Sequence, residues 1–164
     1  MTQSDTKRNT QPIELLKSGQ LLALSKDEPA GLILQKPFHA EFVGPGAAVG
    51  GMFDVQCVTI HTLGKAEFTV PENKEERQVA FNQRLEDISL IQTLCDEVPL
   101  KRAIALLELF REKQFALDEI QTIPNEVLAK LVGVLPSTFE MAWQQQLGPA
   151  LSNQPAAFEE YAVA

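Results

Sequence analysis

The segment from 124 to 147, PNEVLAKLVGVLPSTFEMAWQQQL, constrains the fold of this chain more than any other. Leu128 and Val132 lie four residues apart, which is the spacing of one face of an amphipathic helix. Gly133 follows directly, and glycine can adopt the positive φ of a sharp turn without strain. Pro136 suits the first turn of a second helix, where the missing N–H of proline is no loss. The segment therefore predicts two short helices joined by a tight turn.

The second predicted helix has an inward face made of Phe139, Ala142 and Trp143, at positions i, i+3 and i+4. Ala129 and Gly133 are small and also four residues apart, so the two helices can cross closely. This is the helix-turn-helix pattern, in which the second helix can lie in the major groove of DNA. The segment is therefore a candidate for contact with DNA.

The charge of the chain opposes DNA binding. The formal net charge is −8, whereas binding to the DNA backbone requires lysine and arginine side chains that neutralise phosphates. From 118 to 147, Lys130 is the only basic residue beside four acidic ones, so the local net charge is −3. The acidic residues are Asp118, Glu119, Glu126 and Glu140. A surface of that sign repels phosphates, and we expect any binding to DNA to be weak.

The composition favours a folded protein of the cytoplasm. Hydrophobic residues make up 45% of the 164 residues, which is ample for a core. No apolar run approaches the ~20 residues that span a bilayer. Residues 1–11 are polar and lack the apolar stretch of a signal peptide. We therefore expect a cytoplasmic chain with no membrane contact.

Residues that usually carry catalysis are sparse. Cys57 and Cys95 are the only cysteines, too few for a disulfide framework or a cysteine-ligated metal centre. His39 and His61 are the only histidines, and Cys57 and His61 would share one face of a strand without completing a metal site. The carboxylates are expected to lie solvated on helix surfaces. We expect neither an enzyme nor a bound metal or cofactor.

Between residues 20 and 70 the apolar residues occur in short runs. The runs LLALS, GLILQ, FHAEFV, VQCVTIHTL and KAEFTV are separated by Gly, Pro, Asp and Lys, which is typical of a small antiparallel β unit. The loop GPGAAVGG could cradle a phosphate, but it lacks the Gly-Lys-Ser/Thr ending of a P-loop. Tight turns between strands are the better interpretation of this loop.

Residues 74–94 predict a helix of about six turns, at ~3.6 residues per turn, with an apolar stripe. The stripe consists of Phe81, Leu85, Ile88, Ile91 and Leu94. It can pack on its own domain or against a second copy of the chain. We favour a dimer interface, because a helix of this length outreaches a small β unit. After a break at Pro99, residues 100–110 resume the helical pattern with Ile104, Leu107 and Phe110 inward.

The expected fold class is α+β, with a reduced β-roll, a long dimerisation helix and an all-helical helix-turn-helix region that lacks a wing. The predicted parts are a disordered arm (1–11), a small β domain (12–73), the dimerisation helix (74–97), a helix-turn-helix domain (98–147) and a tail (148–164). Residues 12–17 could form a short helical turn, and residues 122–125 are expected to cap the next helix. Gly148, Pro149 and Pro155 are expected to end regular structure.

This order of parts resembles the Crp/Fnr family of bacterial transcription regulators, in which a β-roll effector domain precedes a long dimerisation helix and a winged helix-turn-helix. RLEDISLIQTL, KRAIALLELF and NEVLAKLVGVLPSTF carry the resemblance, with Gly133 at the turn glycine and Thr138 at the usual threonine of the family. The β segment is similar to a shortened half-roll, with GAAVGGMFD near the phosphate-binding cassette of the family. The resemblance implies a dimeric regulator of transcription.

The chain departs from the family at both ligand-contacting regions. The recognition helix of the family begins Ser-Arg-Glu-Thr and has a second arginine three residues later. Here these positions hold Leu135 to Thr138 and then Met141, and neither proline nor methionine can donate the paired hydrogen bonds by which arginine reads guanine. The cassette lacks the acidic residue and the arginine that hold a cyclic nucleotide, so we do not expect one.

Two hypotheses from different classes follow. The first is a sequence-specific DNA-binding regulator that uses the helix at 136–147. The second is a homodimeric protein of the same fold that acts around transcription through protein–protein contact, with a full-length regulator or the transcription machinery as partner. In both, the contacting residues are expected to be Pro136, Ser137, Thr138, Glu140, Met141 and Gln144. The charge and the missing arginines favour the second hypothesis.

Overall fold

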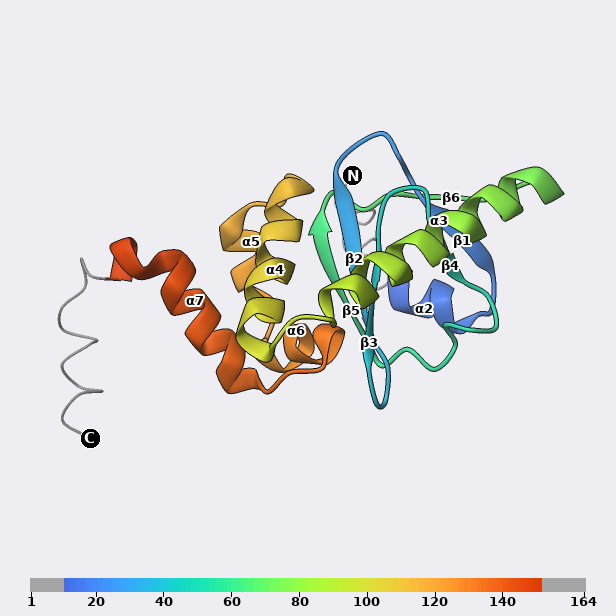
Figure 1. Cartoon of the computed structure of the whole chain (residues 1–164). Helices are drawn as coiled ribbons and strands as arrows, with labels where there is room; N and C mark the ends of the chain where they lie inside the picture. Colours follow the sequence, from blue (N-terminus) through green and yellow to red (C-terminus); the bar gives the residue numbers. More distant parts are fainter. Residues whose placement is uncertain (1–10, 152–164) are drawn as a thin grey trace, which may run out of the picture.

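The structure is a computed structural model that describes residues 11–151, and its fold is of the predicted α+β class (Figure 1). The arm at 1–10 and the tail beyond residue 151 lie outside the described residues. A short helix, α2 (Gln11–Lys17), precedes two antiparallel sheets of three strands each. One sheet has the order β4 (Ala48–Gly50), β1 (Leu21–Leu24), β6 (Phe68–Thr69). The other has the order β3 (Ala40–Val43), β2 (Ala30–Gln35), β5 (Thr59–Gly64).

Strand β2 is buried on both faces, and its side chains alternate between two cores. Leu32 and Leu34 join a core between the two sheets that also includes Leu16 of α2. Ile33 points the other way and packs with the helices of the second half of the chain. The near-continuous apolar run GLILQ therefore reflects a strand that separates two cores.

The glycine-rich loop contains a strand that the sequence did not predict. Residues 48–50 form β4, which pairs with β1 through Leu22 and Val49. Gly46 and Gly50 have φ of 81° and 84°, so the chain turns tightly on both sides of β4, as expected of this loop. The run VQCVTIHTL is also shorter as a strand than predicted, because turns occupy its first residues and β5 begins at Thr59.

The second half of the chain is helical, as predicted. Its helices are α3 (Lys74–Leu94), α4 (Pro99–Glu112), α5 (Leu117–Gln121), α6 (Asn125–Val132) and α7 (Pro136–Leu151). The side chain of Asn73 caps α3 by accepting the N–H of Glu76 at 2.8 Å. Helix α7 continues through Gly148 and Pro149, so the end predicted at 147 is wrong. A proline removes one intrahelical hydrogen bond, and this loss did not end the helix.

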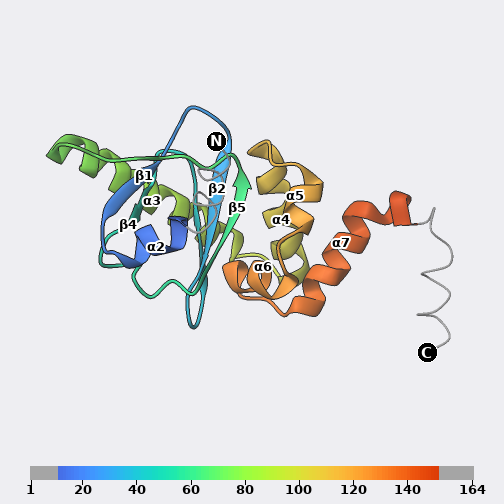
Figure 2. The same cartoon turned by 180° about the vertical axis from the view of Figure 1, so that it is seen from behind.

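One core joins the sheet β3-β2-β5 to the helices. Phe42 of β3 lies 5.3 Å from Phe110 of α4, measured between ring centroids, and 6.3 Å from Phe115. Ile33 and Leu63 belong to the same core as Leu128 of α6. Seen from behind, α4, α5 and α6 lie beside β5, and α7 projects away from the sheets beyond them (Figure 2). Residues from both 12–73 and 98–147 thus contribute to one core. The domain boundaries predicted from the sequence stay a prediction.

Among the residues that the structure describes, none of the helices has the length and apolar character needed to cross a membrane.

Candidate functional site

The corner between α6 and α7 is built around Gly133. This residue ends α6 with φ 66° and ψ 46°, so the positive φ predicted from the sequence is confirmed. The N–H of Val134 donates to the carbonyl of Ala129 at 3.0 Å, which satisfies one of the last carbonyls of α6. Phe139 and Ala142 of α7 are fully buried in the helical core. The two helices therefore meet at a fixed turn.

Two side-chain contacts attach α7 to its neighbours. The indole Nε1 of Trp143 donates to Oδ1 of Asn125 at 3.2 Å, and Nη1 of Arg111 donates to Oε1 of Gln146 at 3.4 Å. The prediction that residues 122–125 cap the next helix is confirmed for the position of the N-cap, but this cap lacks a side-chain hydrogen bond. Pro124 is the N-cap of α6 and has no such bond, and the carboxamide of Asn125 holds α7 instead.

Arg102 fixes the turn at Gly133 from the side of α4. Its Nη1 donates to the carbonyls of Val132 and Gly133 at 3.0 and 3.2 Å. Its Nη2 and Nε donate to the carbonyl of Glu97 at 2.9 and 3.2 Å. The guanidinium thus ties the α3–α4 connection to the α6–α7 turn. These bonds engage the donors of Arg102 inside the protein, so they compete with any contact of this side chain to a phosphate.

The outer face of α7 holds the residues predicted to contact DNA or a partner. Ser137, Glu140, Met141 and Gln144 are exposed and recur at the spacing of one helix face. Pro136 and Thr138 are partly buried, since they lie close to the turn. These six residues therefore lie on or beside one surface, which we call the α7 face.

The α7 face is polar and weakly acidic, with one exposed apolar side chain and no basic residue. Met141 is 53% exposed, and Leu135, which directly precedes α7, is 70% exposed. Glu140 is the only charged residue between 136 and 147. An exposed methionine is an adaptable contact for another protein, and it offers no donor to a phosphate or to a base edge. A surface of this kind can contact another protein, whereas it offers no cation to a phosphate.

The stripe on α3 is only partly exposed. Leu85 is 61% exposed, whereas Ile91 is buried and packs in the helical core with Leu94 beside it. Phe81 is half-buried against alanines of β1 and β4, and Ile88 is also half-buried. Leu85 therefore presents the most exposed part of the predicted dimer interface, with Phe81 and Ile88 on either side of it.

The face of α3 that packs on the sheets includes two charged residues as well as apolar ones. Its buried residues are Ala80, Arg84, Asp87 and Ile91. Helix α3 contacts β3 and β4, which are edge strands of the two different sheets, and so it spans the seam between them. The expectation that carboxylates lie solvated on helix surfaces is wrong for Asp87, because close packing on the sheets leaves it 2% exposed.

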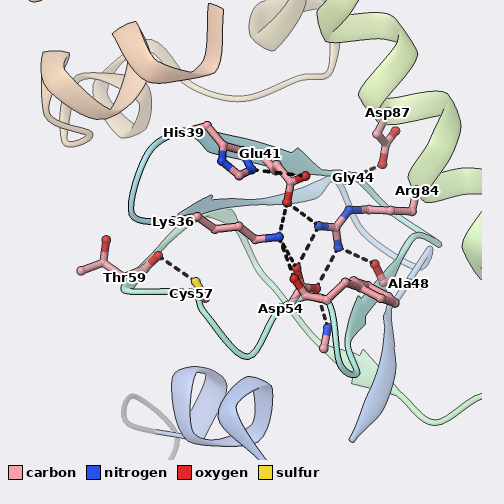
Figure 3. Close-up of polar contacts among 12 residues, drawn as sticks. Lys36, His39, Glu41, Gly44, Ala48, Asp54, Cys57, Thr59, Arg84 and Asp87 are labelled. Carbon is pink, nitrogen blue, oxygen red and sulfur yellow. Dashed lines mark hydrogen bonds and ion pairs between the residues drawn. The ribbon is translucent and has the colours of Figure 1, made fainter. Parts of the chain in front are cut away.

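Arg84 is the centre of a buried network of four charges (Figure 3). Its Nη1 and Nη2 donate to the two carboxylate oxygens of Asp54 at 3.0 Å each, and Nη2 also donates to Glu41 at 2.9 Å. The Nζ of Lys36 pairs with Asp54 at 3.0 Å and with Glu41. The network comprises two cations and two anions from β3, α3 and the turns beside β2 and β4. We call these four residues the charge network.

The charges in this network set one another's ionisation. Burial alone raises the pKa of Asp54, but the hydrogen bonds and charges of Arg84 and Lys36 outweigh it and hold that pKa below its usual value. The pKa of Glu41 is lowered in the same way, with burial opposed by the same two cations. Burial also opposes the charge on Arg84, while Asp54 and Glu41 raise its pKa. All three groups are therefore charged at neutral pH.

Asp87 makes a second buried contact between α3 and the sheets. Its Oδ2 accepts the N–H of Gly44 at 2.8 Å, and its Oδ1 accepts from Gln83 at 3.2 Å. Burial is the largest influence on the Asp87 carboxyl and raises its pKa, because these two hydrogen bonds do not fully offset it. Sequence reasoning missed both Arg84 and Asp87. They lie three residues apart, and Ala80 and Ile91 lie four residues before and after them, which is the one signal that could have placed all four on a single inward face.

Cys57 and His61, the remaining candidates for a reactive site, do not lie on the same strand. Cys57 lies before β5 in the core between the sheets, so the prediction that it shares a strand face with His61 is wrong. Burial raises the pKa of the Cys57 thiol to about 11, which leaves it protonated and unreactive. In the described part of the chain, no group of three or more His, Cys, Asp or Glu side chains could hold a metal ion.

Comparison of the chain with protein-family models, with curated proteins and with solved structures gives no match. Functional inference therefore depends on the chemistry of the surfaces and contacts described above.

Proposed function

We propose that this protein is a regulatory protein that acts around transcription and works through protein–protein contact. In this proposal α6 and α7 form a helix-turn-helix of the Crp/Fnr type, and the preceding sheets correspond to a reduced β-roll. The fixed turn at Gly133 and the long helix α3 before it support this interpretation. The two free thiols, Cys57 and Cys95, suit a reducing compartment such as the cytoplasm.

The observation that carries the proposal is the chemistry of the α7 face. Met141 and Leu135 expose large apolar side chains, and Glu140 supplies the only charge. Burial of these two side chains against another protein is favourable, whereas DNA phosphates require cations opposite them. The partner we propose is a full-length regulator of the same type or a component of the transcription machinery.

The long helix α3 supports a homodimer as the working form. Leu85 is exposed between Phe81 and Ile88, and a second copy of α3 would cover all three side chains. A dimer would also place two α7 faces on one particle.

Sequence-specific DNA recognition is the alternative function, and one observation favours it. Helix α7 projects from the body of the molecule, with Ser137 and Gln144 exposed along it (Figure 1). A projecting helix can enter a major groove, and glutamine can read adenine. The low density of basic residues argues against this alternative.

Fluorescence anisotropy with labelled duplex DNA separates the two functions. We expect weak binding without sequence preference, since each missing bidentate arginine forgoes roughly 1–3 kcal/mol of discrimination. Met141→Arg should create measurable binding where the wild type has almost none. Nanomolar binding of one promoter at physiological salt, with a steep dependence on salt concentration, would contradict the proposal and establish the alternative.

A pull-down from the host, read by mass spectrometry, tests the protein partner. Met141→Glu should remove the partner, because it puts a charge into the apolar contact. Phe38→Glu is the matched control, since Phe38 is 94% exposed in the turn between β2 and β3 and outside the α7 face. Loss of the same protein from both variants would mean that the α7 face is not the docking surface.

A further inference from the structure

Asp54 occupies a site that has the composition of an anion-binding site. Its Oδ2 accepts the N–H of Gly50 at 2.8 Å and Nη1 of Arg84 at 3.0 Å. Its Oδ1 accepts Nη2 of Arg84 at 3.0 Å and lies 3.0 Å from Nζ of Lys36. The Asp54 side chain has no exposed surface. One backbone N–H, a guanidinium fork and an ammonium group thus surround a single carboxylate (Figure 3).

Each of these donors is also held by contacts that do not involve Asp54. Arg84 donates to the carbonyl of Ala48 at 2.9 Å and to Glu41 at 2.9 Å. Lys36 donates to the carbonyl of Phe53 at 2.9 Å. Gly50 belongs to β4 and is fixed by pairing with β1. Removal of the Asp54 carboxylate would therefore leave the donors in place around an empty position.

The charges of the network define what that position would accept. Arg84 and Lys36 balance Asp54 and Glu41, so the loss of Asp54 leaves one uncompensated positive charge in a buried place. The change Asp54→Ala removes one carbon and two oxygen atoms, which are the heavy atoms of formate. A small planar monoanion thus matches both the shape and the charge of the vacated space.

We propose that Asp54 is the built-in occupant of a carboxylate-binding site formed by Arg84, Lys36 and the N–H of Gly50. The site lies between α3 and the edge strands β3 and β4, and the carboxylate within it completes the attachment of α3 to both sheets. Helix α3 is therefore positioned without an external anionic effector. This inference goes beyond the proposed function, since it concerns how α3 is held and does not depend on what the α7 face binds.

Thermal unfolding of the whole chain, followed by circular dichroism, tests the proposal. Wild type, Asp54→Ala and Asp87→Ala are each melted in sodium chloride, sodium formate and sodium benzoate at equal ionic strength. Asp87→Ala is the matched control, because Asp87 is also a buried carboxylate, on the inward face of α3, but its hydrogen bonds come from Gly44 and Gln83 and not from cations.

We expect Asp54→Ala to melt below the wild type in chloride and to recover in formate. The recovery should saturate as one-site binding does and reach roughly 5 °C at formate concentrations well above the dissociation constant. Benzoate is too large for the space and should not substitute. The wild type should have the same melting temperature in formate as in chloride, and so should Asp87→Ala.

Two outcomes would overturn the proposal. One is a formate response of Asp54→Ala no larger than that of Asp87→Ala, or equal for formate and benzoate. The other concerns the case in which Asp54→Ala does not fold in chloride. The variant is then refolded from urea in formate or in chloride, and the amount of soluble protein is measured. Equal failure in both salts contradicts the proposal, whereas folding in formate alone supports it.

Discussion

Arg84 and Asp54 form a buried, two-point ion pair, with both terminal guanidinium nitrogens 3.0 Å from the two carboxylate oxygens. The Arg84 side chain is 5% exposed and the Asp54 side chain is not exposed at all. A pair of this kind gains little over an apolar pair of the same volume, because desolvation offsets most of the attraction. Removal of one partner is strongly destabilising, because the remaining charge stays buried without its partner. The pair therefore makes the position of α3 depend strongly on two residues.

The first prediction is that Arg84→Met strongly destabilises the protein. The methionine fills similar space but leaves two carboxylates, the buried Asp54 and the partly buried Glu41, with Lys36 as the remaining cation of the charge network. We expect a loss of about 3–5 kcal/mol in the free energy of unfolding, measured by urea denaturation. Arg77→Met is the control, because Arg77 is exposed on the same helix and should change stability by less than about 0.5 kcal/mol. Equal urea midpoints for the two variants would show that the network adds nothing.

Helix α3 shows which parts of this arrangement the sequence predicted. The helix has the predicted bounds, because a long 3.6-residue pattern with a capping residue before it is a strong local signal. Its inward face was not predicted, because Arg84 and Asp87 are buried through partners that lie 30 and 43 residues away in the chain. Similarly, β4 was missed because Val49 is its only strand-favouring residue, between Ala48 and Gly50, and its pairing with β1 decides its structure. Local patterns specified the elements, and long-range contacts specified which faces are buried.

The second prediction concerns acid. The pKa values of Asp54 and Glu41 are lower in the folded chain than the ordinary values of 3.8 and 4.5 for these side chains. The folded state therefore binds fewer protons than the unfolded state, so the stability that these groups contribute is complete above the unfolded values. It is lost as the pH falls through the lowered pKa values. We expect the urea midpoint to fall steeply below about pH 4. A midpoint that stays constant from pH 5 to pH 3 would contradict this prediction.

The third prediction has the opposite sign and concerns Asp87. Its pKa is raised in the folded state, so ionised Asp87 destabilises the fold at neutral pH, and this penalty disappears as the pH falls through the raised value. Asp87→Asn keeps an oxygen to accept the N–H of Gly44 without the buried charge. We expect this variant to equal or exceed the wild type by up to about 1 kcal/mol at pH 7. The advantage should vanish in acid. A variant that is clearly less stable than the wild type at pH 7 would mean that the charge itself is needed.

The fourth prediction tests the turn between α6 and α7. Gly133→Val should destabilise the protein by about 1–3 kcal/mol, because a β-branched residue is strained at φ 66°. A Cβ at this position would approach only Nη1 of Arg102, at the ordinary contact distance of 3.9 Å, so crowding adds little. Gly133→Asn is the control, since asparagine tolerates the left-handed region and should cause a smaller loss. If both variants melt like the wild type, the backbone at this turn is not constrained as described.

The last prediction is that the chain is a homodimer through α3, and Leu85 is the residue to change. Phe81, Leu85 and Ile88 share one side of the helix, and Leu85 is 61% exposed, so a monomer would leave an apolar patch in water. Leu85→Lys places a charge at the centre of that patch, where dimerisation would remove it from water. We expect the dimer to weaken by about 2–3 kcal/mol, which is roughly a 30- to 150-fold increase in the dissociation constant.

Sedimentation equilibrium over a range of concentrations measures this change. Phe38→Lys carries the same charge at an exposed apolar position outside α3 and should leave the dimer intact. Because Leu85 has little buried surface within one chain, the variant should keep the thermal unfolding midpoint that the wild type has at concentrations where it is monomeric. A wild type that sediments as a monomer at high concentration would disprove the dimer, and the α3 patch would then need a different partner to cover it.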